Sequence, residues 1–331
     1  MQSWVLNESP GQYVWGEVPT PEPGPDDVRV RVVASALNHI DHWQTTGMPK
    51  PKAMPHVPGS DGAGIVDAVG TDVVGWTVGD EVVVSTATTS AEAVAELGID
   101  CVLDRSLQLI GEHRWGFHGE YIVVPARNLL PRPQNRSWAE CAAYPCAFAT
   151  AWRMFRRARI QPGQTVLVTG IGGGVATAAL ILGRHLGAHV VTTSRDAEKR
   201  AESIRLGAEA SFDSAGPYDV RADIVIDSIG PATFEQCLKA LKPGGRFVTC
   251  GGTSGQTIEV SVPKLFFKQH ELIGSTLGSY EEFAFVTDLL AGGLPVIIDD
   301  VVPLAEFPAA LERIRSSAQL GKIVLDHSIP A

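Results

Sequence analysis

Two hydrophobic patterns divide the chain. In the first 125 residues, apolar residues recur at every second position, most regularly in 27–35 and again in parts of 64–69 and 80–84. This alternation is typical of strands that bury one face. Turns rich in Pro and Gly separate the runs. The pattern therefore predicts a β-rich domain over residues 1–125.

From about residue 126 the pattern changes to short apolar strands that alternate with helical periods. Ser137 and Glu140 form a predicted capping box at the start of a helix over 137–157. The strands that follow are continuously apolar, which is typical of a parallel sheet covered by helices on both faces. We predict a doubly wound parallel-sheet Rossmann domain over 126–269. Its strands are expected at 166–169, 189–193, 224–227 and 246–250, and its helices at 176–186, 198–206 and 234–241.

The last segment, 270–331, has a different organisation. Its pattern predicts helices at 281–291 and 307–317 and strands at 297–302 and 322–325. We expect these elements to form no further βαβ unit and to return to the first domain, which they mostly complete. The predicted fold class is therefore α/β, with a β-rich domain beside a Rossmann domain.

A glycine-rich turn carries the strongest chemical signal in the sequence. It follows the predicted strand 166–169 and opens the next helix. Glycines let the backbone approach the phosphates of a dinucleotide, and the helix N-terminus supplies N–H donors. The strand at 189–193 completes the βαβ context that the motif requires. The alternative is a tight turn that binds nothing. The residues expected to contact the cofactor here are Gly170, Gly172, Gly173, Gly174 and Val175.

Composition narrows the class of partner. The 331 residues are 44% hydrophobic and 19% charged, which is enough to build a full core. A net charge of −10 argues against a nucleic-acid or anionic-membrane partner. No apolar run approaches a membrane span, and the N-terminus lacks the features of a signal peptide. We therefore expect a soluble cytoplasmic protein with a small-molecule substrate. The five cysteines include no Cys-x-x-Cys and are interpreted as structural thiols.

Several segments together resemble the medium-chain dehydrogenase/reductase superfamily. They are residues 36–41, 58–66, 78–82, the glycine turn, 206–208, 241–246 and 321–325. The resemblance extends over nearly the full chain and looks closest to the branch of quinone oxidoreductases and enoyl reductases. It implies a GroES-like catalytic domain followed by the dinucleotide domain. It also implies a homodimer formed through the edge of the dinucleotide-domain sheet.

The sequence departs from this superfamily where its zinc alcohol dehydrogenases hold their metal. In those enzymes, a Cys-His-x-Asp, a Gly-His-Glu and a later cysteine supply the ligands. The matching positions here are Asn38, Ser60 and Cys146. Catalytic zinc takes about three protein donors drawn from Cys, His and carboxylates. Cys146 is one such donor, and Asp61 adds at best a carboxylate, so we expect no metal.

A metal-free site favours a conjugated acceptor. Hydride transfer is the cofactor's own reaction, so the protein aligns the acceptor and stabilises the negative charge that develops. In a quinone or an α,β-unsaturated carbonyl, that charge spreads onto an oxygen that hydrogen-bond donors can hold. The resemblance places Asn38 and His39 in the loop that lines the pocket, with Asp41 ordering that loop. His39 is either a proton donor or a packing residue, and the sequence leaves both open.

The residues after strand 189–193 bear on the choice of cofactor. NAD enzymes of this fold have an acid there, whereas an arginine with small polar neighbours suits the 2′-phosphate of NADP. Here the resemblance aligns Ser194 with the acid, Arg195 follows, and Lys199 lies one turn later, which favours NADP(H). Asp196 is an alternative acid, but we expect it to cap the next helix. The resemblance also implies cofactor contacts from Thr150, Gly251, Leu277 and Lys322, the last approaching a phosphate.

These observations predict an NADPH-dependent, metal-independent oxidoreductase that transfers hydride to a quinone or an α,β-unsaturated carbonyl. Two alternatives stay open. One is an alcohol or aldehyde dehydrogenase, either metal-free or with a depleted zinc site. The other is an NADP-binding protein without turnover, since the glycine turn by itself does not distinguish binding from catalysis.

Overall fold

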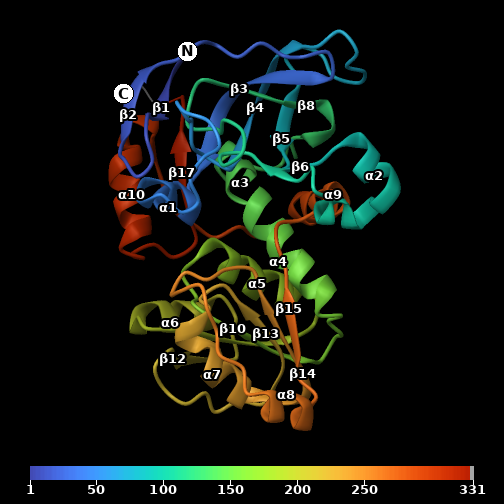
Figure 1. Cartoon of the computed structure of the whole chain (residues 1–331), viewed down its shortest axis with the longest axis vertical. Coiled ribbons are helices and arrows are strands. Elements are labelled where there is room, and N and C mark those ends of the chain that lie inside the picture. Colours follow the sequence, from blue (N-terminus) through green and yellow to red (C-terminus); the bar gives the residue numbers. More distant parts are fainter. Residues whose placement is uncertain (329–331) are drawn as a thin grey trace. The chain divides into compact units, whose positions relative to one another are not determined.

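The computed structural model describes residues 1–328, which fall into two compact units (Figure 1). The first unit joins Met1–Cys146 to the residues from Gly278 onward, and the second is Ala147–Leu277. The predicted boundaries at 125 and 269 therefore lie earlier than those in the structure. The first unit extends beyond residue 125 because β9 (Leu129–Pro131) pairs with β5 (Glu81–Val84) and α3 (Trp138–Ala143) packs on its sheet.

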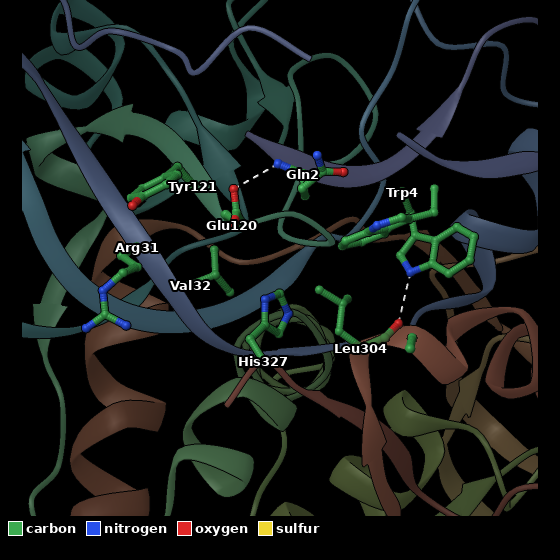
Figure 2. A pocket seen from close by; sticks show the side chains of 10 residues that line it. Gln2, Trp4, Arg31, Val32, Glu120, Tyr121, Leu304 and His327 are labelled. Atoms are coloured by element: carbon green, nitrogen blue, oxygen red, sulfur yellow. Dashed lines mark hydrogen bonds between the residues drawn. The ribbon is translucent and has the colours of Figure 1, made fainter. Parts of the chain in front are cut away.

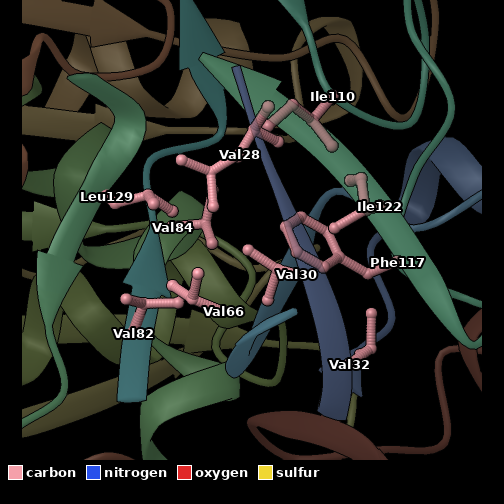
Figure 3. Packing of buried hydrophobic residues seen from close by; sticks show 11 residues of the cluster. Val28, Val30, Val32, Val66, Val82, Val84, Ile110, Phe117, Ile122 and Leu129 are labelled. Carbon is pink, nitrogen blue, oxygen red and sulfur yellow. The ribbon is translucent and has the colours of Figure 1, made fainter. Parts of the chain in front are cut away.

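Within the described residues, the first unit is built on a seven-stranded sheet in the order β16-β17-β3-β4-β5-β9, with β8 also paired to β3. In β3, the valines at 28, 30 and 32 are buried and alternate with more exposed residues, as the sequence pattern predicted. These valines pack against Phe117 and Ile122 in the core of the unit (Figure 3). The remaining strands of the sheet are β3 (Asp27–Ala36), β4 (Asp61–Val69), β8 (Tyr121–Pro125), β16 (Ile298–Pro303) and β17 (Lys322–Asp326).

Smaller elements complete the first unit. Two two-stranded sheets are formed by β1 (Gln2–Leu6) with β2 (Tyr13–Glu17) and by β6 (Ala87–Thr88) with β7 (Gln108–Leu109). Among the described residues, three short 3₁₀ segments lie at Gly98–Leu103, Ala126–Asn128 and Leu304–Glu306. The helices besides α3 are α1 (His39–Thr46), α2 (Ala91–Leu97), α9 (Tyr280–Ala291) and α10 (Phe307–Arg315).

The C-terminal segment rejoins the first unit, as predicted, but our expectation that it forms no βαβ unit is wrong. Strands β16 and β17 pair in parallel, and α10 lies in the connection between them. Parallel neighbours need such a crossover, and a helix supplies it. Phe307, Ala310 and Ile314 on α10 are buried in one apolar cluster with Ile323 and Leu325 of β17.

The second unit has the predicted doubly wound form. Its parallel sheet has the order β12-β11-β10-β13-β14-β15. Its strands are β10 (Thr165–Val168), β11 (His189–Ser194), β12 (Ala210–Asp213), β13 (Ala222–Asp227), β14 (Leu241–Thr249) and β15 (Glu271–Gly274). Its helices are α5 (Gly174–His185), α6 (Ala197–Arg205), α7 (Pro231–Ala240) and α8 (Val262–Lys268), with most of α4 (Pro145–Arg157). The sequence pattern missed β12, α8 and β15.

The single helix predicted over 137–157 is two helices. Its predicted capping box is present, with the Ser137 hydroxyl accepting the Glu140 N–H and the Glu140 carboxylate accepting the Ser137 N–H. However, α3 ends at Ala143 and α4 begins at Pro145. Proline lacks the N–H that a continuous helix needs, and it is favoured at a first helical position. In residues 1–328, no helix is long and apolar enough to cross a membrane.

Candidate active site

The loop between β3 and α1 is held by one buried carboxylate. Asp41 has no exposed surface, and both of its oxygens accept backbone N–H groups. Oδ2 accepts the N–H of Asn38 at 2.8 Å, and Oδ1 accepts the N–H of Gly59 at 3.0 Å. Asp41 therefore fixes the backbone at Asn38 and ties this loop to the segment before β4.

Beside this loop lies a buried ion pair, which we call the Lys322 cluster and which consists of Lys322, Asp61 and Asn38. The Lys322 ammonium donates to Asp61 Oδ2 at 2.8 Å and to Asn38 Oδ1 at 2.7 Å. The Asn38 amide also donates to Asp61 Oδ2 at 2.8 Å. Asp61 Oδ1 accepts the backbone N–H of Cys146 at 2.7 Å. The side chains of Lys322 and Asp61 are 4% and 0% exposed, so this charge pair is enclosed by protein.

Strand pairing brings the members of the cluster together. In the central sheet, Ala36 of β3 lies opposite Asp61 at the start of β4 and opposite Val324 of β17. Asn38 lies two residues after Ala36, and Lys322 lies two residues before Val324. The register of these strands therefore brings together side chains from three separate parts of the sequence.

Of the three positions that resemblance assigns to zinc ligands, only Asn38 belongs to the Lys322 cluster. Asn38 and Cys146 match two of those positions, and the Asn38 amide is engaged by Lys322 and Asp61. The third position is Ser60, whose buried hydroxyl has no hydrogen-bond partner in the described structure. Across residues 1–328 there is no group of three or more His, Cys, Asp and Glu side chains placed to hold a metal ion. This donor set does not fit zinc, which requires about three such ligands.

His39 is the first residue of α1 and is half-buried. Burial lowers its pKa to about 4, with a further contribution from the positive charge of Lys322. At pH 7 the imidazole is therefore neutral. A neutral imidazole is a weak proton donor, so this state favours the packing and orienting role that the sequence had left open.

A chain of buried polar groups connects Asp41 to His327. His118 Nε2 is 3.6 Å from Asp41 Oδ2, and His118 Nδ1 is 2.9 Å from the hydroxyl of Ser35. That hydroxyl is also 2.9 Å from His327 Nε2. His118 and Ser35 have no exposed surface. No sequence motif links these two residues to Asp41. Burial, followed by the charge of His118, lowers the pKa of His327 to about 3.

His327 also lines a cavity of about 530 Å³ in the first unit (Figure 2). Trp4, Trp15 and Leu304 supply its apolar wall, and the Trp4 indole N–H donates to the carbonyl of Leu304 at 2.9 Å. The predicted catalytic residues Asn38, His39 and Asp41 are not among those that line this cavity. The chain of polar groups thus runs from the cavity wall to Asp41.

In the second unit, the glycine turn fits a dinucleotide pyrophosphate. Gly170 has φ +68° and Gly172 has φ +133°, which is backbone that favours glycine. A Cβ at Gly170 would lie 2.5 Å from Ile229 Cδ1, whereas a Cβ at Gly173 would meet nothing within 4 Å. Helix α5 begins at Gly174, and no side chain caps its N-terminus in the described structure. Its first N–H groups can therefore donate hydrogen bonds to a bound anion.

The end of β11 carries the residues that the sequence predicts to bind the adenosine ribose. Asp196 caps α6, as predicted, and its Oδ1 accepts the N–H groups of Glu198 and Lys199 at 2.8 and 3.1 Å. Ser194 is buried at the strand end, and Arg195 beside it is exposed. Within residues 1–328, the Arg195 guanidinium has no ion-pair partner, so it is available to an anionic group.

The remaining predicted cofactor residues divide between the units. Thr150, Gly251 and Leu277 lie in the second unit with the glycine turn, whereas Lys322 lies in the first. Leu277 has φ +47° and is buried. The predicted contact of Lys322 with a cofactor phosphate stays a prediction, and in this structure its ammonium is bound by Asp61 and Asn38.

One buried carboxylate near the glycine turn was missed by the sequence reasoning. Asp227, at the end of β13, accepts hydrogen bonds from the hydroxyls of Thr169, which follows β10, and of Thr249, which ends β14. It also accepts the N–H of Gly230 at 3.0 Å. Burial raises the pKa of Asp227, and these hydrogen bonds oppose that shift. Asp227 therefore joins three strand ends beside the predicted pyrophosphate site.

Known protein families match both the β-rich part and the Rossmann part of the chain. Two family models match, the alcohol dehydrogenase GroES-like domain over residues 24–134 and the zinc-binding dehydrogenase domain over residues 174–292. A zinc-type alcohol dehydrogenase-like protein of Schizosaccharomyces pombe is 33% identical over 322 residues, covering 91% of each chain.

Two solved structures are similar over almost the whole chain. A crystal structure of an NAD-dependent alcohol dehydrogenase has 35% identity and a TM-score of 0.92, covering 98% of this chain and 99% of that one. A 2-octenoyl-CoA carboxylase reductase in complex with NADP and 2-octenoyl-CoA has 28% identity and a TM-score of 0.90, covering 98% and 87%.

The chain therefore belongs to the medium-chain dehydrogenase/reductase superfamily, and it is an oxidoreductase. The predicted fold class, a GroES-like domain with a Rossmann domain, is confirmed. One of the matching models is named for zinc binding. At the positions that resemblance assigns to the catalytic zinc ligands, this chain carries Asn38, Ser60 and Cys146, and the Asn38 side chain is bound by Lys322 and Asp61.

Proposed function

We propose that this protein is an NADPH-dependent, metal-independent reductase of α,β-unsaturated carbonyl compounds, with unsaturated acyl thioesters as the favoured class. The observation that carries the proposal is the Lys322 cluster. In this cluster Asn38 stands at a position where a zinc dehydrogenase has a metal ligand, and its side chain is bound by the Lys322 ammonium and the Asp61 carboxylate. A simple alcohol or ketone is hard to activate without a Lewis acid, whereas a conjugated acceptor is easier.

The ribose end of the cofactor site supports NADPH. The carboxylate of Asp196 is committed to capping α6, so it is not the acid that binds a ribose 2′-hydroxyl in NAD enzymes. Arg195 offers a fork of N–H donors to a 2′-phosphate, beside the hydroxyl of Ser194. The similar carboxylase reductase was solved with NADP, whereas the similar alcohol dehydrogenase is NAD-dependent. The residues of this chain favour the former.

The preference for an unsaturated acyl thioester rests on the same similarity. The carboxylase reductase was solved with 2-octenoyl-CoA, which carries a carbon–carbon double bond conjugated to a thioester carbonyl. When bound, NADPH supplies the hydride. The protein's own part is to orient the acceptor and to hold the charge that appears on its carbonyl oxygen. Asn38 and Lys322 carry the polar groups for this task, and neutral His39 lies beside them.

Steady-state oxidation of NADPH and of NADH tests the proposal. The acceptor panel comprises crotonyl-CoA, a simple enone, a benzoquinone and acetaldehyde, each with and without a chelator. We expect turnover with NADPH and the unsaturated thioester or enone, and no effect of the chelator. Turnover confined to acetaldehyde and abolished by the chelator contradicts both the acceptor class and the metal-free site.

A second candidate is an alcohol or aldehyde dehydrogenase, which the similar Schizosaccharomyces and NAD-dependent proteins favour. The same panel separates the two, because this candidate requires reduction of acetaldehyde and the reverse oxidation of ethanol. A protein that binds NADPH tightly but reduces nothing in the panel is the non-catalytic alternative.

We further propose a homodimer formed through the β15 edge of the second unit's sheet. In the described structure, β15 is the end strand of that sheet and pairs with β14 alone. On α8, which precedes β15 in the chain, Phe266 and Phe267 are 57% and 79% exposed. An unpaired edge beside exposed aromatic rings is a favourable place for a second copy of the chain to pair.

A further inference from the structure

We propose that Asp227 is a positioning residue for the cofactor. It holds the glycine turn and the segment after β14 in the arrangement that binds the pyrophosphate and the nicotinamide half of NADPH. The inference concerns the second unit alone. It rests on the proposed function and deepens it by naming the group that orders the cofactor site. Asp227 has no exposed surface, so it acts through its neighbours and does not touch the cofactor itself.

Asp227 lies at the place in the sheet where a dinucleotide crosses. In a doubly wound sheet, the cofactor lies at the carboxyl ends of the strands, at the point where the strand order reverses. In the order β12-β11-β10-β13-β14-β15, the reversal lies between β10 and β13. Asp227 is the last residue of β13, and its Oδ1 accepts the hydroxyl of Thr169, which follows β10, at 2.8 Å. This hydrogen bond therefore bridges the two strands at the crossing point.

Several donors from separate segments converge on the Asp227 carboxylate. In the described structure, Oδ1 accepts the hydroxyls of Thr169 and Thr233 and the N–H of Ile229, and Oδ2 accepts the hydroxyl of Thr249 and the N–H of Gly230. These donors belong to the segment after β10, the turn after β13, the first turn of α7 and the end of β14. A single buried side chain therefore sets how these segments lie relative to one another.

Two of the donors lead directly to predicted cofactor contacts. Thr169 immediately precedes Gly170, the first glycine of the turn. The Thr249 hydroxyl oxygen accepts the N–H of Gly251 at 3.4 Å, which links Asp227 to that residue. Through these two threonines, the same carboxylate holds the glycine turn of one mononucleotide half and the Gly251 segment of the other.

The arrangement requires an acceptor at both oxygens of Asp227. Each oxygen accepts one backbone N–H, from Ile229 at 3.3 Å and from Gly230 at 3.0 Å. An asparagine amide has one acceptor oxygen and one NH₂ donor group. In Asp227→Asn, either orientation of the amide turns a donor toward one of these N–H groups, which cannot rotate away as a hydroxyl can. Because asparagine has nearly the same shape as aspartate, the variant disturbs the hydrogen bonds without opening a cavity.

The test compares Asp227→Asn and Thr169→Val with the wild-type protein, and Asp223→Asn is the matched control. Asp223 lies near the amino end of the same strand, where it accepts the N–H of Thr165 and the ammonium of Lys242, each at 2.8 Å. Each variant is first checked for a native melting transition and near-UV circular dichroism. Calorimetric titrations then use NADPH and adenosine 2′-monophosphate, which lacks the pyrophosphate and the nicotinamide.

We expect Asp227→Asn to weaken NADPH binding about 10–100-fold, because it leaves a buried backbone N–H without an acceptor. Thr169→Val removes one hydroxyl from the carboxylate and should weaken NADPH binding about 3–10-fold. The affinity for adenosine 2′-monophosphate stays within about twofold of wild type, because Ser194 and Arg195 at the end of β11 form a separate site. Asp223→Asn should leave both affinities unchanged.

Equal losses for both ligands in folded Asp227→Asn overturn the proposal in favour of a general role in the fold. Wild-type NADPH affinity in both folded variants overturns it as well. If Asp227→Asn does not fold, Thr169→Val decides by the same comparison of the two ligands. If the wild-type protein binds neither NADPH nor adenosine 2′-monophosphate, the proposed function itself fails.

Discussion

The buried pair between Lys322 and Asp61 leads to a stability prediction that can be worked out from its burial. Replacing Lys322 with Met leaves the Asp61 carboxylate enclosed without its cation. The two side chains are 4% and 0% exposed, so solvent screens this interaction little. Removing one partner of such a pair costs about 3–5 kcal/mol. Asp61 keeps its hydrogen bonds from Asn38 and Cys146, so we expect the lower end, about 3 kcal/mol.

Urea unfolding followed by tryptophan fluorescence measures this cost. Every tryptophan except Trp152 belongs to the first unit, so the signal reports mainly on the unit that contains the pair. The series comprises Lys322→Met, Asp61→Asn and the double variant. Because the two residues are in contact, the double variant should lose less free energy of unfolding than the sum of the single variants, by about 2 kcal/mol.

Lys242→Met provides the comparison for a less enclosed ion pair. The side chains of Lys242 and Asp223 are 40% and 23% exposed, and such pairs contribute less than about 1 kcal/mol. The reasoning is refuted if Lys322→Met costs no more than this control. It is also refuted if the effects of Lys322→Met and Asp61→Asn simply add.

Four further predictions concern the cofactor, the assembly and pH. Gly172→Val should abolish measurable NADPH binding in a fluorescence titration, because φ +133° excludes a β-branched residue; retained affinity contradicts the assigned turn. Arg195→Ala should weaken NADPH binding about 10–100-fold and leave NADH binding unchanged, which calorimetry distinguishes, because a charge-assisted hydrogen bond is worth about 1.5–3 kcal/mol; equal losses for both cofactors argue against a 2′-phosphate contact. Phe267→Glu should convert the dimer to a monomer by light scattering, and a wild-type monomer rules out the proposed interface. Burial lowers the pKa of His327 to about 3 in the folded protein, whereas the pKa of an unfolded histidine is about 6.5. Between these two values the unfolded chain binds more protons than the folded protein, so the free energy of unfolding falls as the pH drops below about 6.5. Between pH 7 and pH 5, His327→Asn should reduce that loss by about 2 kcal/mol in urea unfolding, and an unchanged pH slope contradicts the assignment.

The sequence was most informative where function depends on a short continuous motif. The glycine turn, the capping role of Asp196 and the doubly wound order each depend on residues close together in the chain. Local backbone needs and hydrophobic period determine such features, so they can be predicted without knowing which strands pair.

The Lys322 cluster could not be predicted in this way. Lys322 and Asp61 are separated by 261 positions and meet because β17 and β4 pair with the same strand. The chain from Asp41 through His118 and Ser35 has the same origin, since its members come from separate segments of the first unit. Hydrophobic period identifies strands but does not give their register or order.

The differences in the second half of the chain have local causes. Pro145 divides the predicted helix over 137–157, because a proline inside a helix removes a hydrogen bond. Strands β12 and β15 are four residues each and partly exposed at the sheet edges, so they lack a continuous apolar run. Strands β16 and β17 pair in parallel, with α10 in the connection between them, and the apolar face of α10 packs against residues of β17.

The central claim is that this oxidoreductase reduces a conjugated acceptor without a metal ion. One measurement tests it most directly: NADPH-dependent reduction of crotonyl-CoA by protein that has been dialysed against a chelator, with zinc content determined by mass spectrometry on the same sample. The account predicts full turnover at well under one zinc per ten chains. Turnover that disappears with the zinc, and returns when zinc is added, would contradict the account.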